Sequence, residues 1–252
     1  MSWSRGRRWP LLVPRRTRLR NGSSESSAGA RGGNFGNGTI DGGQAEAIRV
    51  PLASSTLVRV PGSGHPDAIL RSVVALSDAV STGHHAAVSS GVKPGDTVAV
   101  VGDGAVGLCA ILASKRLGAE RIIALSRHSE RQRIARVFRA TVVMESRGEE
   151  AKRRGPRADR RRGRRRGAGV GTQQAIDTTA AIARPGSTIG IVGVPHGSVP
   201  FNGTFFRNVG WRGGPAPARI YIPDLLDDVL DGTIDPGPVR DFETNPDGTR
   251  EA

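Results

Sequence analysis

Aromatic residues, cysteines and long apolar runs are scarce in this chain. Aromatic side chains make up 4% of the 252 residues, and Cys109 is the single cysteine. One cysteine excludes an internal disulfide framework and any zinc site built from several cysteines. No run of 18 apolar residues occurs, so we expect no membrane-spanning helix. Because Cys109 lies inside a predicted helix, we interpret it as a core residue rather than a nucleophile.

The N-terminus is rich in arginine and holds only a short apolar patch at residues 9–13, which prolines interrupt. Such a segment lacks the apolar core of a signal peptide, and we expect a cytoplasmic protein. With 37% hydrophobic residues, the chain can still build a core for one large domain or two modest ones.

The net charge of +14 is concentrated in two segments. Residues 1–20 contain seven arginines and no acid, and residues 152–166 contain nine arginines, one lysine and one aspartate. The remainder carries 20 basic and 22 acidic residues, a net charge of −2. A dedicated nucleic-acid-binding fold usually carries its basic face on ordered elements. We therefore do not expect nucleic acid as a partner, and we expect no membrane partner.

A glycine motif organises the ordered part of the sequence. Residues 97–107 read T-V-A-V-V-G-D-G-A-V-G, a short apolar strand followed by Gly102-x-Gly104-x-x-Gly107, and a helix-forming segment follows. This pattern predicts a dinucleotide-binding βαβ unit. The glycines permit a tight turn, close approach of the pyrophosphate and close packing of the helix. Ala105 and Val106 place backbone N–H groups at the helix N-terminus, which favours phosphates.

The next predicted strand, Arg121 to Leu125, ends at Ser126-Arg127. Dinucleotide folds often carry an acid here for the ribose 2′-hydroxyl, whereas an arginine accommodates a 2′-phosphate. We therefore favour NADP over NAD, with Ser126 and Arg127 as cofactor-binding residues. The alternative is that Arg127 faces solvent at the start of a helix.

Hydrophobic periodicity predicts the other elements. We expect short strands at residues 45–50 and 54–60, helical segments over 66–91, a helix at 129–138 and a strand at 141–144. Further on, we expect a helix at 173–183 with Thr172 as N-cap, strands at 188–193 and 209–212, and a short helix at 224–230. The fold class is α/β: a doubly wound (Rossmann) parallel sheet with a fragmentary β-rich catalytic domain.

A doubly wound fold needs a central strand between the predicted strand at 141–144 and the predicted helix at 173–183, but residues 158–169 in this interval read A-D-R-R-R-G-R-R-R-G-A-G. Unpaired charges are costly in a strand buried on both faces, so we expect this strand to be lost. Three interpretations stay open: an inserted arm for nucleic acid or an acidic partner, a solvated loop without a role, and a shift of reading frame. The last also covers residues 1–33.

The segment 76–107, with L-S-D-A-V-S-T-G-H-H-A-A-V-S-S-G-V-K-P-G-D-T-V-A-V-V-G-D-G-A-V-G, resembles the zinc-dependent alcohol dehydrogenases. These form part of the medium-chain dehydrogenase/reductase superfamily, and the resemblance is to its formaldehyde and threonine dehydrogenase-like branch. Segments 118–128, 183–197 and 205–219 continue the resemblance.

The resemblance implies hydride transfer between a small alcohol or aldehyde and NAD(P). It also implies zinc as a second cofactor of the family, which we do not expect this chain to bind well. A homo-oligomer is a separate expectation that the sequence leaves open. Asp78 matches a zinc ligand, Thr82 a catalytic-site residue beside the nicotinamide, and Gly193, Val194 and Pro195 a loop near that ring. As alternatives, Asp78 is an ordinary helix residue and Thr82 an N-cap. The zinc-ligating N-terminal domain has no counterpart here, so we expect impaired activity. The rival functions are a non-catalytic nucleotide-binding remnant and an arginine-rich interaction protein.

We expect the chain to divide into four parts. Residues 1–33 are a disordered or non-native basic segment, 34–66 a remnant of the β-rich domain, 67–237 an NAD(P)-binding domain interrupted at about 152–169, and 238–252 a truncated C-terminal return.

Overall fold

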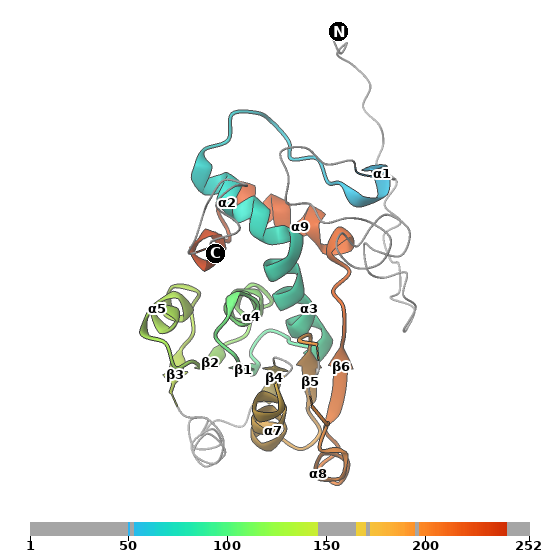
Figure 1. Cartoon of the computed structure of the whole chain (residues 1–252). Helices are drawn as coiled ribbons and strands as arrows, with labels where there is room; N and C mark the ends of the chain where they lie inside the picture. Colours follow the sequence, from blue (N-terminus) through green and yellow to red (C-terminus); the bar gives the residue numbers. More distant parts are fainter. Residues whose placement is uncertain (1–49, 51–52, 146–164, 170–171, 195–196, 241–252) are drawn as a thin grey trace, which may run out of the picture.

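A computed structural model describes residues 50, 53–145, 165–169, 172–194 and 197–240. These residues form a six-stranded parallel sheet in the order β3-β2-β1-β4-β5-β6 (Figure 1). The order reverses between β1 and β4, and ligands of doubly wound sheets bind at such a switch point. The strands are β1 (Thr97–Val101), β2 (Arg121–Leu125), β3 (Val142–Met144), β4 (Arg165–Gly169), β5 (Thr188–Ile191) and β6 (Gly210–Gly213).

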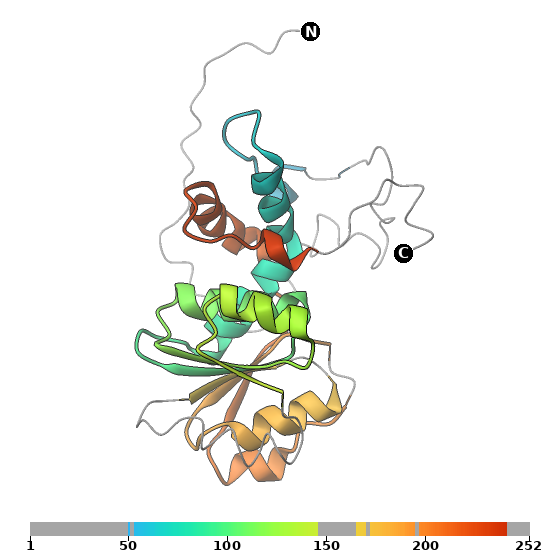
Figure 2. The same ribbon diagram turned by 90° about the vertical axis from the view of Figure 1, so that its left-hand side faces the viewer.

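Helices cover both faces of this sheet (Figure 2). On one face lie α4 (Ala105–Arg116) and α5 (Ser129–Val137), and on the other lie α7 (Gln173–Ile182) and α8 (Phe201–Phe205). Strand β1 is buried at every position because its side chains alternate between these two layers. Its residues Val98 and Val100 pack with Ile111 of α4, while Ala99 and Val101 pack with the α7 side.

A helical layer lies above the α4 face (Figure 1). It contains α2 (Asp67–Ala75), the π-helical turn η2 (Leu76–Val80), α9 (Ala218–Leu230) and the 3₁₀ turn η3 (Gly237–Val239). Helix α3 (Ser81–Ser90) runs from this layer to the sheet and packs against α4 and β5 (Figure 1). Helix α3 ends at Gly91, whose φ of 74° suits glycine. The C-terminal half of α3 packs closely on β5, since a Cβ at Gly190 of β5 would overlap the carbonyl oxygen of Ala86.

The expected loss of the central strand is wrong. Residues 165–169 form β4, which pairs with β1 on one side and β5 on the other. Backbone ladder hydrogen bonds do not depend on the side chain, and the part of β4 beside the end of β1 is Gly167-Ala168-Gly169. The two arginines of the strand, Arg165 and Arg166, pair with the beginning of β1, Thr97 and Val98.

Two other expectations need correction. Residues 54–60 do not form a strand: α1 (Ala53–Thr56) is a helical turn, and 57–60 have no regular structure. An isolated strand lacks backbone partners, and Val58 and Val60 instead pack against the α2/α9 cluster. Helix α9 begins at Ala218 rather than at residue 224, and it contains Pro223. The other predicted elements match the structure to within a few residues.

Several predicted segments lie outside the described residues. The ranges that the structure does not describe are 1–49, 51–52, 146–164, 170–171, 195–196 and 241–252. They include the predicted strand at 45–49, most of the arginine run and Pro195. Within the part of the chain that is described, no helix is long and apolar enough to cross a membrane.

Candidate functional site

The glycine turn lies between β1 and α4 at the carboxyl edge of the sheet. Gly102 has φ 126°, a value that side-chain-bearing residues rarely adopt. A Cβ at Gly107 would overlap the carbonyl oxygen of Gly102, so α4 approaches the turn as closely as a glycine allows. A Cβ at Gly104 would meet nothing within 4 Å. The turn thus presents open backbone at Gly104 and a close helix contact at Gly107.

A cleft of about 240 Å³ opens beside this turn. One wall is the turn itself, the second is the loop between β2 and α5 with the first turn of α5, and the third is the first two turns of α7. Thr172 caps α7, since its Oγ1 accepts a hydrogen bond from the Ala175 N–H at 3.3 Å. The lining residues are Val101, Gly102, Asp103, Gly104, Arg127, His128, Arg131, Thr172, Gln174, Ala175 and Thr178.

Asp103 joins the glycine turn to the β2–α5 loop. Its Oδ2 accepts hydrogen bonds from Ser126 Oγ at 3.1 Å, from the Arg127 N–H at 2.9 Å and from the His128 N–H at 3.4 Å. The Arg131 guanidinium lies 3.8 Å from Oδ1. The predicted cofactor residue Ser126 is therefore buried and donates its hydroxyl to Asp103, whereas Arg127 is exposed on the cleft.

The structure brings some predicted residues together and leaves others apart. Gly102, Gly104 and Arg127 line one cleft. Ala105, Val106 and Gly107 form the first turn of α4 next to it. Gly193 and Val194 lie in the loop after β5, and Val194 is 73% exposed. Their neighbour Pro195 lies outside the described residues.

The two residues that the resemblance assigned to chemistry touch each other. Thr82 Oγ1 donates a hydrogen bond to Asp78 Oδ1 at 3.0 Å, one helical turn apart. Thr82 is not an N-cap, because η2 continues into α3 and the preceding Val80 is itself helical. Asp78 is exposed on η2. Among the residues described, no three His, Cys, Asp or Glu side chains are grouped around a point that could hold a metal ion.

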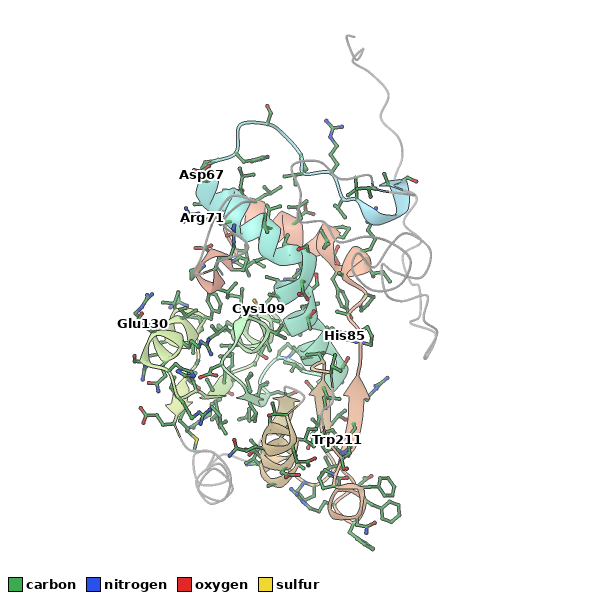
Figure 3. The ribbon with its side chains drawn as sticks, in the orientation of Figure 1. Asp67, Arg71, His85, Cys109, Glu130 and Trp211 are labelled. Carbon is green, nitrogen blue, oxygen red and sulfur yellow. The ribbon has the colours of Figure 1, made fainter. Side chains whose placement is uncertain are left out.

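Cys109 and two neighbouring histidines, His84 and His85, lie away from the cleft lining. Cys109 is fully buried among the helices (Figure 3), and burial, with Asp78 nearby, raises the pKa of its thiol to about 12. His84 and His85 both lie beside Tyr221 of α9, with ring centroids 4.8 and 5.8 Å from its ring. His85 Nδ1 and Tyr221 Oη are 2.9 Å apart.

Sequence reasoning missed Asp103 and the α7 residues of the cleft. The signal for Asp103 was an acid between the first two glycines of the motif, but its partners lie 23 to 25 positions away in the chain. Thr172, Gln174 and Thr178 follow the arginine run and reach the cleft only because β4 fills its place in the sheet.

Strand order, glycine turn and cleft together define a doubly wound α/β protein of the Rossmann type. The chain is 34% identical over 230 residues to an uncharacterized zinc-type alcohol dehydrogenase-like protein of Bacillus subtilis, covering 80% of this chain and 59% of that one. It is 32% identical over 213 residues to a probable zinc-binding alcohol dehydrogenase of Mycobacterium tuberculosis, covering 80% and 51%. No family model matches the chain.

A match over a shorter segment and a likeness to a solved structure point to the same group of proteins. A glutathione-independent formaldehyde dehydrogenase of Pseudomonas aeruginosa is 43% identical over 82 residues, which are 32% of this chain and 21% of that one. The solved alcohol dehydrogenase from Thermus sp. ATN1 superposes with a TM-score of 0.70 at 28% identity, covering 79% of this chain and 57% of that one. The chain is therefore a relative of the zinc-type alcohol dehydrogenases of the medium-chain superfamily. It spans somewhat more than half the length of the first of these relatives.

Proposed function

We propose that this chain binds NADP in preference to NAD in the cleft between the glycine turn and α7. We further propose that it acts as the nucleotide-binding part of an oxidoreductase for a small alcohol or aldehyde. The observation that carries the proposal is the cleft itself, which is lined by open backbone at Gly104 and by the basic side chains of Arg127, His128 and Arg131. The names of the relatives, alcohol and formaldehyde dehydrogenases, support the substrate class.

The glycine turn and the start of α4 fit a pyrophosphate. Gly104 leaves its side of the turn open, and the turn lines the cleft. The N-terminus of the 12-residue α4 offers the backbone N–H groups of Ala105, Val106 and Gly107, together with the positive end of the helix dipole. We assign these residues and Gly102 to the phosphates.

The loop between β2 and α5 and the first turn of α5 fit the adenosine end of the cofactor. Arg127, His128 and Arg131 line the cleft, and no acid stands at the end of β2, where NAD-binding folds usually carry one. Guanidinium groups bind phosphate oxygens with two parallel hydrogen bonds. We therefore assign Arg127 and Arg131 to the 2′-phosphate of NADP, with Ser126 beside them.

The remaining predicted residues belong to the nicotinamide end in this proposal. Gly193 and Val194 follow β5, the second strand beyond the switch point, so the loop 193–195 is assigned to the ring. Thr82 is assigned to the substrate side. A nicotinamide cofactor supplies the site that accepts or donates hydride, while the protein orients it and excludes water.

The described residues do not fit a zinc site. Asp78 is exposed, its carboxylate accepts a hydrogen bond from Thr82, and no further ligating side chains are grouped with it in the ranges described. The Cys109 thiol is buried, and its raised pKa keeps it protonated at neutral pH. We therefore derive no step of the reaction through zinc from these residues.

Fluorescence titration with NADPH and NADH tests the cofactor assignment. Replacing Arg127 with alanine should raise the Kd for NADPH about tenfold, because one charge-assisted contact is lost, and leave that for NADH unchanged. Arg133→Ala is the matched control, since Arg133 lies on α5 outside the cleft lining and pairs with Glu130 at 3.2 Å. Equal weakening of both cofactors by Arg127→Ala would contradict the assignment.

Alcohol-dependent reduction of NADP, measured with and without added zinc, tests the activity. Reduction that follows the cofactor preference supports the oxidoreductase. Binding of NADPH without any reduction would leave a nucleotide-binding protein that does not turn over alcohols, and absence of binding would reject the whole proposal.

We also propose that the chain associates with itself. Strand β6 is an edge strand of the sheet, and the adjacent Phe201, Phe205 and Phe206 are 66%, 63% and 85% exposed. Exposed clusters of large apolar side chains often mark interfaces. Light scattering after size exclusion should give more than one chain per particle, and Phe205→Asp with Phe206→Asp should lower that number.

A further inference from the structure

Asp103 occupies a site whose donors resemble those of a phosphate site. The carboxylate accepts hydrogen bonds from one hydroxyl and two backbone N–H groups, on Ser126, Arg127 and His128, at 2.9 to 3.4 Å. The Arg131 guanidinium lies 3.8 Å away, and the Asp103 side chain is 7% exposed. The two N–H groups stand directly before the nine-residue α5, where the helix dipole favours an anion.

The carboxylate at this end of the cleft is supplied by the glycine turn. In many dinucleotide folds the acid stands at the end of the second strand and bonds the ribose 2′-hydroxyl. Here that position holds Ser126 and Arg127, and the acid reaches across from the residue between the first two glycines. A phosphate bound next to Arg127 would therefore share this cleft with the negatively charged Asp103 carboxylate.

We infer that Asp103 sets how strongly this chain prefers NADP over NAD. It does so in two ways: its charge repels the 2′-phosphate, and it takes up donors of the Ser126–His128 turn that would otherwise bind phosphate oxygens. Arg127 and Arg131 act in the opposite direction. The preference is the balance between these groups, and the inference rests on the proposed binding of NAD(P) in this cleft.

Asp103→Asn separates charge from shape. The amide has the size of the carboxylate, and its oxygen can still accept the Arg127 N–H, but the negative charge is gone. In the full chain, fluorescence titration should give a Kd for NADPH about tenfold lower than in the wild type, because a desolvated repulsion is removed. The Kd for NADH, which has no 2′-phosphate, should change by less than about twofold.

Asp96→Asn is the matched control. Asp96 is also a buried aspartate that accepts a backbone hydrogen bond, from the Lys93 N–H at 3.0 Å. It precedes β1 and so lies at the opposite edge of the sheet from the cleft. Its substitution should leave the ratio of the two dissociation constants unchanged. If Asp103→Asn is not folded by circular dichroism, Asp103→Ser, whose hydroxyl can also accept the Arg127 N–H, makes the same test.

The outcomes are distinct. A fall in the Kd for NADPH alone supports the inference. A parallel change of both constants, or a rise in the Kd for NADPH relative to NADH, would overturn it, since Asp103 would then only hold the loop in place. Failure of the wild-type chain to bind either dinucleotide rejects the proposed function itself, and the inference with it.

Discussion

The side chain of Gln173 forms a two-way hydrogen-bonded pair with the backbone of Ser198. The Ser198 N–H donates to Gln173 Oε1 at 2.7 Å, and Gln173 Nε2 donates to the Ser198 carbonyl oxygen at 3.0 Å. Gln173 is the first residue of α7, and Ser198 lies in the loop that follows β5. A Cβ at Gly197, the residue before Ser198, would overlap Gln173 Oε1, so this hydrogen-bonded pair needs glycine at position 197. The pair fixes this loop to the helix that borders the cleft.

Gln173→Ala should therefore loosen the loop that we assign to the nicotinamide. We expect a several-fold lower kcat with NADP, and a smaller change in the Kd for NADPH, because the phosphate contacts are elsewhere. The substitution removes the two hydrogen bonds to Ser198 and a third from Gln173 Nε2 to Asp177, and because all three lie at an exposed site, stability should fall by only about 1 kcal/mol. Steady-state kinetics and thermal unfolding check these expectations.

Asp177→Ala is the control for that variant. Asp177 accepts a hydrogen bond from Gln173 Nε2 at 2.9 Å, but its removal leaves both contacts to Ser198 in place. Equal effects of the two substitutions on kcat would show that the pair with Ser198 does not position the loop.

Two glycines of the motif should respond differently to alanine. A Cβ at Gly107 would overlap the carbonyl oxygen of Gly102, so Gly107→Ala should displace α4 and destabilise the fold by about 2 kcal/mol or more. A Cβ at Gly104 meets nothing within 4 Å, and its φ of −74° suits alanine. Gly104→Ala should leave the melting temperature unchanged yet weaken NADPH binding about tenfold, because the methyl group enters the cleft.

Thermal unfolding and NADPH titration of both variants make the comparison. If Gly104→Ala binds NADPH as the wild type does, the pyrophosphate does not approach this part of the turn.

The glycine unit could be predicted from the sequence because its signals are local. The strand at 97–101 is a continuous apolar run that is buried at every position, and the helix follows directly after the turn. Local signals also predict β2 and β5, which are short apolar runs, and α7, which Thr172 caps. In each case the residues that determine the element lie within it.

Strand β4 could not be predicted in this way. Its sequence, R-R-G-A-G, has neither apolar alternation nor β-branched residues, and its place comes from backbone pairing with β1 and β5 on both sides. The role of Asp103 was hidden for a similar reason. Its partners lie on another loop, and only the parallel pairing of β1 with β2 brings the two loops together.

The Cys109 thiol should be unreactive toward thiol reagents in the folded protein. It is fully buried, and the pKa of its thiol is raised to about 12, so almost no thiolate exists at neutral pH. A disulfide reagent such as Ellman's should react with less than about a tenth of the thiol in native protein and with all of it in denaturant. Rapid reaction under native conditions, with the chain still folded by circular dichroism, would show that this helix packing opens readily.

His84 should make the stability depend on pH. Burial, the nearby Arg116 and His85 lower its pKa from 6.5 to about 4. The imidazole is 6% exposed, and its Nδ1 has no hydrogen-bond partner among the residues described. The folded state thus binds this proton less readily than the unfolded state does. The contribution of neutral His84 to the free energy of unfolding is fully present above pH 6.5. This contribution is lost as the pH falls from 6.5 toward 4, by about 3 kcal/mol at most.

Replacing His84 with phenylalanine should flatten this part of the pH profile. Phenylalanine keeps the ring beside Tyr221, which lies 4.8 Å from the imidazole, and removes the titrating group. His65→Gln is the control, since His65 lies in the loop before α2 and bonds the Pro61 carbonyl oxygen at 2.7 Å. Urea unfolding at several pH values between 4 and 7.5 measures the slope. An unchanged slope in His84→Phe would mean that groups other than His84 take up the proton on unfolding, and that its burial does not govern the acid sensitivity of the fold.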